Sequence, residues 1–377
     1  MARRIVILGL LAAALVPLLP VLHPYWYERE PARRPEYGVN FSCRHAAWLG
    51  LDCRETYLAI LDDLQVKHLR LSVYWSDVEP SPGRYDFEHL DWLLDEAAER
   101  DVQVLLTVGV KAQRYPEFYP PEWLVSAAEV PARFTFAEDA EVEARALALV
   151  RHTVEHYAHH PAVAAWQVEN EPYLPNIGPE KGWSVGRDLV LREIQVVRET
   201  DPLGRPVVVN HASHHRFDPY WRDILATADV LAQNVYTRKP FPLSWLGGLY
   251  VSPYRLGPFT ADLSRQARAA DQAGKALWIT ELQAEPWERA DVRLLRQEQI
   301  GSIDLRRLEE NLRLAANSGA TRVYLWGAEW WYYQLEAFGD DRWWQAAREI
   351  FAEEIDAATR LDTWPLPARP GPAGGVA

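Results

Sequence analysis

The stretch AVAAWQVENEPYLP (residues 162–175) joins an apolar run to three consecutive polar residues. The run at 162–168 is apolar almost throughout, which is typical of a parallel strand buried on both faces. Glu169, Asn170 and Glu171 follow it directly, and a proline comes next. Buried carboxylates are costly unless they are neutralised or used. The stretch therefore predicts a buried parallel strand whose end carries functional polar side chains.

Apolar runs of this kind alternate with amphipathic stretches from about residue 35 onward. Eight runs are present, at 37–42, 66–73, 102–110, 162–169, 205–212, 229–236, 275–282 and 321–328. Helical patterns include 87–100, 141–160, 304–319 and 343–359. Eight strand-and-helix units favour an α/β fold of the (β/α)8 (TIM) barrel type over a doubly wound sheet. No glycine-rich phosphate loop follows the first run, which argues against the dinucleotide-binding alternative.

Composition narrows the class of protein. The chain has 377 residues, of which 48% are hydrophobic and 12% aromatic, and a net charge of −13. A chain of this length can bury a large core. The acidic balance argues against a nucleic-acid partner, because phosphate binding needs a basic face. The 17 Trp residues indicate either an aromatic-rich core or flat surfaces that stack on sugar rings.

The N-terminus differs from the rest of the chain. Arg3 and Arg4 precede an apolar run of 18 residues, 5–22, which is intermediate between a signal-peptide core and a short membrane span. No small-x-small cleavage site follows, so we interpret the run as an uncleaved membrane anchor, with a cleaved signal as the alternative. We expect residues 1–34 to form this signal or anchor and a spacer. Residues 35–360 would form the barrel, and 361–377, rich in Pro and Gly, a disordered tail.

Two patterns bear on disulfides and metals. Cys43 and Cys53, the only two Cys residues, predict a short disulfide loop in an exported protein, with two free thiols as the alternative. The segment HTVEH (152–156) has the H-x-x-E-H spacing of a zinc site. We interpret it as a solvated helix surface, because this helix leads into the strand at 162 and does not follow one. The sequence predicts no metal and no other cofactor.

Chemistry in such a barrel lies at the C-terminal ends of its strands. The polar and aromatic residues at these ends are Arg70, Asn170, Glu171, Asn234, Tyr236, Glu281 and Trp326. Two carboxyl groups, one protonated and one ionised, can together split a glycosidic bond. An Arg and a Tyr beside the ionised group would keep it charged and oriented. The set therefore predicts a site that cleaves sugars.

Five segments carry a family resemblance. They are LRLSVYWSDVEPSPGRYDFEHLDWLLDEA (69–97), WQVENEP (166–172), QNVY (233–236), LWITELQ (277–283) and YLWG (324–327). In this order they resemble the large clan of (β/α)8 retaining glycoside hydrolases with catalytic glutamates on strands four and seven, which includes cellulases and mannanases. The first segment is similar to the strand-two region of family 42-type β-galactosidases. The resemblance covers about residues 37–350.

The resemblance implies a role for each matched residue. Glu171 would be the general acid/base and Glu281 the nucleophile. The expected substrate contacts are Arg70 and Tyr236 beside the nucleophile, Asn170 at the sugar 2-hydroxyl, Trp326 under the sugar, and Glu285, Trp287 and Trp330 in the following loops. For the last three, loop charge or core packing is the alternative. The chain departs from the cellulase family at Lys111 and Asn234, where that family usually shows His.

We predict from this resemblance a retaining β-glycosidase that cleaves β-linked oligo- or polysaccharides by double displacement. Retention requires the two carboxyl groups to lie about 5 to 5.5 Å apart. A transglycosylase would use the same residues, whereas a carbohydrate-binding pseudoenzyme would not need both glutamates. We expect the chain to be anchored in the cell membrane with the barrel outside the cytoplasm, or secreted if the signal is cleaved. The sequence leaves the sugar, the linkage and the oligomeric state open.

Overall fold

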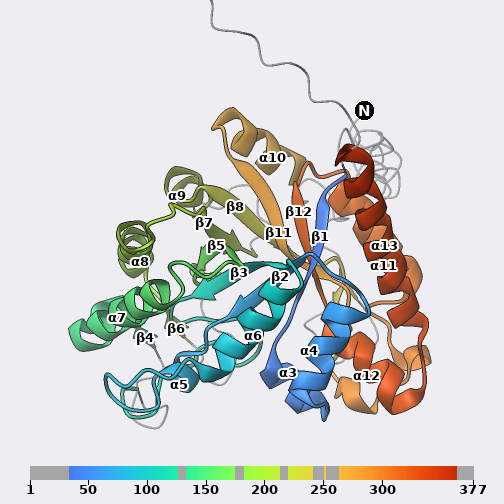
Figure 1. Ribbon diagram of the computed structural model, residues 1–377, viewed down its shortest axis with the longest axis horizontal. Coiled ribbons are helices and arrows are strands. Elements are labelled where there is room, and N and C mark those ends of the chain that lie inside the picture. Colours follow the sequence, from blue (N-terminus) through green and yellow to red (C-terminus); the bar gives the residue numbers. More distant parts are fainter. Residues whose placement is uncertain are drawn as a thin grey trace, which may run out of the picture.

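The computed structural model describes residues 34–125, 133–174, 182–212, 220–240, 250–251 and 263–362. Eight parallel strands close into a barrel in the order β1-β12-β11-β8-β7-β5-β3-β2 (Figure 1). Their bounds are β1 Glu36–Asn40, β2 His68–Ser72, β3 Gln103–Val108, β5 Val163–Val168, β7 Val207–His211, β8 Val230–Val235, β11 Ala276–Gln283 and β12 Arg322–Trp326. Each of the eight apolar runs overlaps one of these strands, so the predicted barrel is confirmed.

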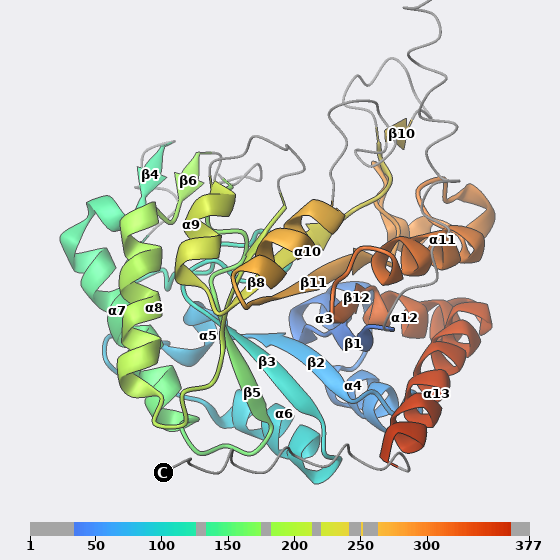
Figure 2. The ribbon, with the colours of Figure 1, turned by 90° about the horizontal axis from the view of Figure 1, so that it is seen from above.

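Helices surround the barrel (Figures 1 and 2). They are α3 Cys43–Leu49, α4 Cys53–Asp62, α5 Trp75–Val78, α6 Glu88–Glu99, α7 Ala140–His156, α8 Arg187–Thr200, α9 Tyr220–Thr227, α10 Leu263–Gln272, α11 Leu305–Ala316, α12 Ala328–Phe338 and α13 Arg342–Asp362. The helical patterns predicted at 87–100, 141–160, 304–319 and 343–359 correspond to α6, α7, α11 and α13. Short strands β4 Phe134–Thr135, β6 Trp183–Ser184, β9 Lys239–Pro240 and β10 Tyr250–Val251 pair outside the barrel.

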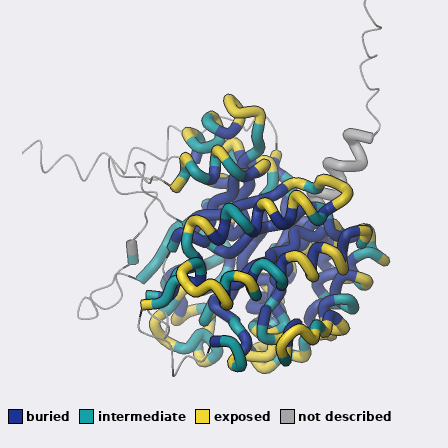
Figure 3. The backbone as a smooth tube through the Cα atoms, turned by 90° about the vertical axis from the view of Figure 1, so that its left-hand side faces the viewer, coloured by how far each residue is buried: buried dark blue, intermediate teal, exposed yellow. Residues whose placement is uncertain are grey.

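Two apolar clusters hold the barrel together. The larger one lies between the strands and the surrounding helices. Figure 3 shows that the buried residues gather in the interior of the molecule. The smaller one takes alternate residues from six strands: Leu105, Ala165, Val208, Val230, Ala232, Trp278 and Tyr324. Because side chains alternate between the two faces of a strand, this second cluster fills the inside of the barrel. Strands buried on both faces explain the near-continuous apolar runs in the sequence.

The disulfide predicted between Cys43 and Cys53 is present, with Cα atoms 4.9 Å apart. It joins the first residues of α3 and α4, directly after β1. Asp52 caps α4 by accepting a hydrogen bond from the backbone N–H of Glu55. The link therefore fixes the chain where it leaves the first barrel strand.

The predicted membrane anchor and the predicted tail lie almost entirely outside the described residues. Within the described part of the chain, no helix combines the length and apolar character needed to cross a membrane.

Candidate active site

Arg70 lies at the centre of a polar network at the C-terminal ends of the strands. Its fully buried guanidinium donates to Glu281 Oε1 at 2.8 Å and to Asn40 Oδ1 at 2.9 Å through Nη1. Nε donates to Gln167 Oε1, and Nη2 donates to Asn170 Oδ1, both at 2.8 Å. These partners come from β1, β11, β5 and the residues just after β5, so one side chain fixes the relative positions of four barrel strands.

Glu281 is held on both of its carboxylate oxygens. Arg70 binds Oε1, and the hydroxyl of Tyr236, just after β8, donates to Oε2. The register of β11 against β8 shifts between Ile279 and Glu281, a β-bulge that changes the direction of the side chain. Burial raises the pKa of Glu281, the charge of Arg70 opposes this, and the charge of Glu171 adds to it, with a net rise. Glu171 and Glu281 therefore act on each other electrostatically at the same end of the barrel.

Glu171 follows β5 in a left-handed backbone conformation, with φ of 49°. This conformation is uncommon outside glycine and is found at functional sites. Its backbone N–H donates to Asn210 Oδ1 at 2.7 Å, and its carbonyl accepts from Lys111 Nζ at 3.1 Å. Its Oε1 accepts from Asn234 Nδ2 at 2.6 Å. Neutral amides thus position Glu171, whereas an arginine and a phenol hold Glu281.

The amide of Asn170 has a fixed orientation. Its Oδ1 accepts from Arg70 Nη2 at 2.8 Å and from Asn210 Nδ2 at 3.0 Å. Because both donors bind the oxygen, the assignment of the amide oxygen and nitrogen is determined. Its Nδ2 has no protein acceptor within the described part of the chain and is available to a ligand. The contact of Asn170 with a sugar 2-hydroxyl, which the resemblance implies, stays a prediction.

Glu169 is buried behind the site, against the main chain that follows β3. Its carboxylate accepts from the backbone N–H groups of Val110 at 2.8 Å and Lys111 at 2.6 Å. Gly109 allows this approach, because a Cβ there would lie 2.4 Å from Glu169 Oε1. Burial raises the pKa of Glu169 to about 7. Burial, and then the charge of Glu169, raise the pKa of Glu193 on α8 well above its usual value.

Trp326 has a partner that the sequence did not indicate. The guanidinium of Arg114 lies 3.9 Å from the centroid of its ring, so a cation covers one face. Arg114 also donates to Glu285 and, at 2.9 Å, to Glu329 Oε2. Burial acts to raise the pKa of Glu285, but the charges of Arg114 and His45 outweigh it and lower the pKa to about 2. Glu285 therefore belongs to a buried ion-pair cluster beside Trp326.

The two remaining predicted aromatic contacts have different surroundings. Trp287 is 38% exposed, and its ring lies edge to face with Tyr236 at 4.6 Å between centroids. Trp330 is 1% exposed and contacts Trp343 at 5.0 Å. The interpretation of Trp330 as a sugar contact is corrected to core packing, because its ring lies between α12 and α13. Trp287 keeps an exposed ring at the same end of the barrel as Tyr236.

Lys111, which stands where the cellulase family shows His, ties two loops together. Its buried ammonium donates to the carbonyls of Glu171 at 3.1 Å and Leu174 at 3.2 Å. It also forms an ion pair with Glu117 at 3.2 Å. Burial raises the pKa of Glu117 to about 7, although the charge of Lys111 acts to lower it. Lys111 thus fixes the main chain that carries Glu171.

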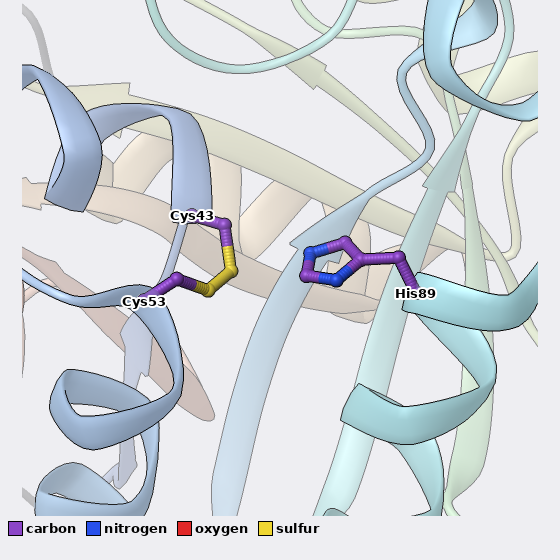
Figure 4. Close-up of side chains that lie close together, drawn as sticks. All are labelled: Cys43, Cys53 and His89. Atoms are coloured by element: carbon purple, nitrogen blue, oxygen red, sulfur yellow. A yellow bond between two sulfur atoms is a disulfide. The ribbon is translucent and has the colours of Figure 1, made fainter.

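Two groups of residues that contain histidine could suggest a metal site, but their side chains make contacts within the protein. His156 of the H-x-x-E-H segment pairs with Asp91 at 2.7 Å on an exposed helix face. The ligand atoms of Cys43, Cys53 and His89 lie within 4.8 Å of one another, with the imidazole beside the sulfur atoms (Figure 4). A metal needs thiolates, whereas these two sulfurs are joined to each other. In this state the cluster is a disulfide with a neighbouring imidazole.

The strand interiors supply polar residues to which the sequence analysis gave no role. Asn210 donates to Asn170 Oδ1 at 3.0 Å and accepts from the backbone of Glu171 at 2.7 Å. Thr280 Oγ1 donates to Asn234 Oδ1 at 2.7 Å, which turns the amide nitrogen of Asn234 toward Glu171. The available signal was a polar residue inside an otherwise apolar run, as in VVVNH (207–211).

Fold and site together define a class of protein. The fourth and seventh strands of the closed barrel are β5 and β11, and they carry Glu171 and Glu281 at their C-terminal ends. A buried arginine and a tyrosine bind the second glutamate. This is the arrangement implied by the resemblance to the retaining (β/α)8 glycoside hydrolases.

Comparisons with known proteins support the same class. A family model described as beta-galactosidase (glycoside hydrolase family 42) matches residues 51–178. The beta-galactosidase Bga of Halorubrum lacusprofundi is 29% identical over 135 residues, which cover 31% of this chain and 18% of that protein. The beta-galactosidase BbgII of Bifidobacterium bifidum is 32% identical over 111 residues, covering 26% and 15%. The chain thus matches less than a fifth of the length of these relatives.

Solved structures share the fold over most of the chain. The beta-galactosidase of the psychrophilic Marinomonas ef1 matches with a TM-score of 0.59 and 19% identity, covering 87% of this chain and 60% of that one. The beta-galactosidase of Bacillus circulans sp. alkalophilus matches with a TM-score of 0.54 and 14% identity, covering 87% and 57%. These comparisons confirm the resemblance to (β/α)8 glycoside hydrolases that the sequence motifs indicated.

Proposed function

We propose that this protein is a retaining β-glycosidase in which Glu281 is the nucleophile and Glu171 the general acid/base. The observation that carries the proposal is the difference between the hydrogen-bond donors of the two carboxyl groups. Arg70 and Tyr236 donate to Glu281, which favours its ionised form. A neutral amide, from Asn234, donates to Glu171. The family match and the beta-galactosidase relatives support a β-glycoside as the substrate.

The first displacement forms a glycosyl-enzyme. A carboxylate oxygen of Glu281 attacks the anomeric carbon, and the bond from that carbon to the leaving oxygen breaks. Glu171 gives its proton to the leaving oxygen, so the aglycone departs as a neutral alcohol. Asn170 Nδ2 donates to the oxygen of the sugar 2-hydroxyl, a contact that strengthens as the anomeric carbon becomes positive.

The second displacement releases the sugar. Glu171, now ionised, takes a proton from a water molecule whose oxygen attacks the anomeric carbon. The ester bond to Glu281 breaks, and the carboxylate returns to its place between Arg70 and Tyr236. Two inversions give overall retention. A sugar hydroxyl in place of water would give transglycosylation with the same residues.

Hydrolysis of a panel of 4-nitrophenyl β-glycosides tests the proposal. We expect release of 4-nitrophenol, with the β-anomer of the free sugar as the first product in a proton NMR time course. First appearance of the α-anomer would show inversion and contradict the mechanism. Binding of sugars without any turnover would favour the pseudoenzyme alternative.

We also propose that the barrel works outside the cytoplasm, held by the apolar segment at 5–22 or released by its cleavage. The support is the disulfide between Cys43 and Cys53, because stable disulfides belong to oxidising compartments. Fractionation of cells that express the full chain tests this. Full-length protein in the membrane fraction, digested by protease added to intact cells, is the expected result. Protection until the cells are lysed would place the barrel inside.

A further inference from the structure

One cation at the C-terminal end of the barrel differs from the others in its surroundings. Lys239 lies on β9, three residues after Tyr236. Its ammonium nitrogen lies 5.1 Å from the centroid of the Tyr236 ring and 4.7 Å from that of Trp287. Within the described part of the chain it makes no hydrogen bond and no ion pair. The hydroxyl of the same Tyr236 binds the nucleophile, so Lys239 lies beside the catalytic pair.

The other cations of the site each have a carboxylate partner. Arg70 pairs with Glu281 at 2.8 Å, Lys111 with Glu117 at 3.2 Å, and Arg114 with Glu285 and with Glu329 at 2.9 Å. A partly buried ammonium without such a partner loses hydration without gaining a hydrogen bond. Burial accordingly lowers the pKa of Lys239, while the charges of Glu171 and Glu281 act to raise it. Among the described residues, the ammonium of Lys239 therefore has no carboxylate within ion-pair distance.

The main chain before Lys239 is fixed to the strand of the nucleophile. Gln283, two residues after Glu281, accepts from the backbone N–H of Arg238 and donates to its carbonyl, both at 2.9 Å. Asn311 on α11 donates to the carbonyl of Gln283 at 2.8 Å. These hydrogen bonds hold the start of β9 in place relative to Glu281. A lysine that is positioned in advance binds an anion at a lower entropic cost than a free surface lysine.

We propose that Lys239 recognises a negatively charged group on the substrate, so that the enzyme acts on anionic β-glycosides such as uronides or sulfated sugars. The inference rests on the proposed glycosidase function and names its substrate class. The ammonium would donate charge-assisted hydrogen bonds to a carboxylate or sulfate oxygen. The exposed Trp287 would contact the apolar face of the same or the adjacent sugar ring.

The test compares matched substrates and matched variants. The substrates are the 4-nitrophenyl β-galactoside, its 6-sulfate, the β-galacturonide and the β-glucuronide. The variants are Lys239→Met, which keeps the length and removes the charge, and Lys239→Arg, which keeps the charge. Lys67→Met is the control, because Lys67 is exposed and precedes β2, at the opposite end of the barrel. Circular dichroism melts check that each variant is folded.

We expect wild type to prefer at least one anionic substrate, and the preferred one distinguishes carboxylate from sulfate. Lys239→Met should lower kcat/KM for that substrate by roughly 10- to 100-fold more than for the neutral galactoside. Lys239→Arg should retain much of the preference, and Lys67→Met should retain all of it. Hydrolysis of the neutral galactoside with no anionic preference, or an equal loss on both substrates in Lys239→Met, would overturn the inference and leave the glycosidase function standing.

Binding separates failure of the inference from failure of the function. Calorimetric titration with D-galacturonate, D-glucuronate, D-galactose 6-sulfate and D-galactose needs no turnover. The inference predicts at least one anionic sugar that binds about tenfold or more tightly than D-galactose to wild type, with the difference lost in Lys239→Met. Equal affinities would overturn it. If no glycoside is cleaved but the anionic preference in binding is present, the proposed hydrolysis fails and the anion site remains.

Discussion

Individual residues of this site depend on one another because their partners are buried. Arg70 is the clearest case, since its guanidinium satisfies Asn40, Gln167, Asn170 and Glu281 at once. Replacing one member leaves the other buried groups with unmet hydrogen bonds. The cost of such a change therefore exceeds the worth of any single contact.

Arg70→Met should lower the free energy of unfolding by about 3–5 kcal/mol, because it leaves the Glu281 carboxylate buried and unpaired. It should also reduce kcat, since the nucleophile loses the group that favours its ionised form. Urea unfolding and steady-state kinetics measure the two effects. Arg44→Met is the control, because its pair with Asp77 is partly exposed and should be worth less than about 1 kcal/mol. Equal losses in both variants would contradict the role of Arg70.

The two glutamates should respond differently to truncation. Glu281→Ala should abolish turnover, and added azide should then give a glycosyl azide of inverted configuration, because the small anion fills the place of the nucleophile. Glu171→Ala should keep activity on substrates with good leaving groups, which need no proton. Mass spectrometry and NMR of the products identify the azides. If the two variants behave the other way round, the assigned roles are wrong.

Between elements, buried ionisable groups connect the site to the helices around it. Glu193 on α8 acts electrostatically on Glu169, which follows β5 and precedes Asn170 and Glu171. The backbone of Glu169 has φ of 62°, so this turn combines strain with a buried charge. The stability of the folded protein should therefore vary with pH.

A carboxyl group whose pKa is raised by folding stabilises the folded state fully at pH values below the pKa it has in the unfolded chain. This stabilisation is lost as the pH rises through the pKa it has in the folded protein. For Glu169 the folded pKa is about 7, so stability should fall between about pH 4.5 and pH 7 or just above. Glu193→Gln removes a buried carboxyl group whose pKa is itself raised by folding, so the free energy of unfolding should depend less on pH. Urea unfolding at pH 5 and pH 8 measures the difference. An unchanged dependence would show that folding does not raise the pKa of Glu193.

The disulfide that joins α3 to α4 closes a short loop. Its removal should lower the free energy of unfolding by about 2–3 kcal/mol, as expected for a loop of roughly ten residues. The double variant Cys43→Ala/Cys53→Ala, compared with wild type with and without reductant, measures this. Peptide mapping of protein from its native compartment should recover the two cysteines linked. Free thiols there would contradict the proposed compartment.

At the scale of the whole molecule, barrel closure brings together residues of the site that are far apart in the sequence. Arg70 and Glu281 are 211 residues apart in the sequence and 2.8 Å apart in space. We expect a crystal structure to show the carboxyl groups of Glu171 and Glu281 about 5 to 5.5 Å apart, as retention requires. A separation near 9 Å, with room for a water between them, would instead predict inversion.

Much of the fold and part of the site could be predicted from the sequence. Strand and helix periodicity are local properties, so the eight apolar runs, α6 and α7 were placed within a few residues. The paired glutamates were visible because each lies at or just beyond the end of an apolar run. The supporting amides were less visible, since Asn210 and Asn234 resemble ordinary polar residues within a strand.

The sequence by itself determined the barrel class, the strand order along the chain and the two candidate glutamates. The reason is that hydrophobic periodicity and polar residues at strand ends are local properties of the sequence. Only the tertiary structure decided which partner each side chain meets. It buried Trp330 against Trp343, laid Arg114 over Trp326 and left Lys239 without a carboxylate among the described residues. These outcomes depend on strand register, on the bulge in β11 and on loops far apart in the chain. No local sequence pattern encodes these side-chain contacts, because each is set by the closure of the whole barrel.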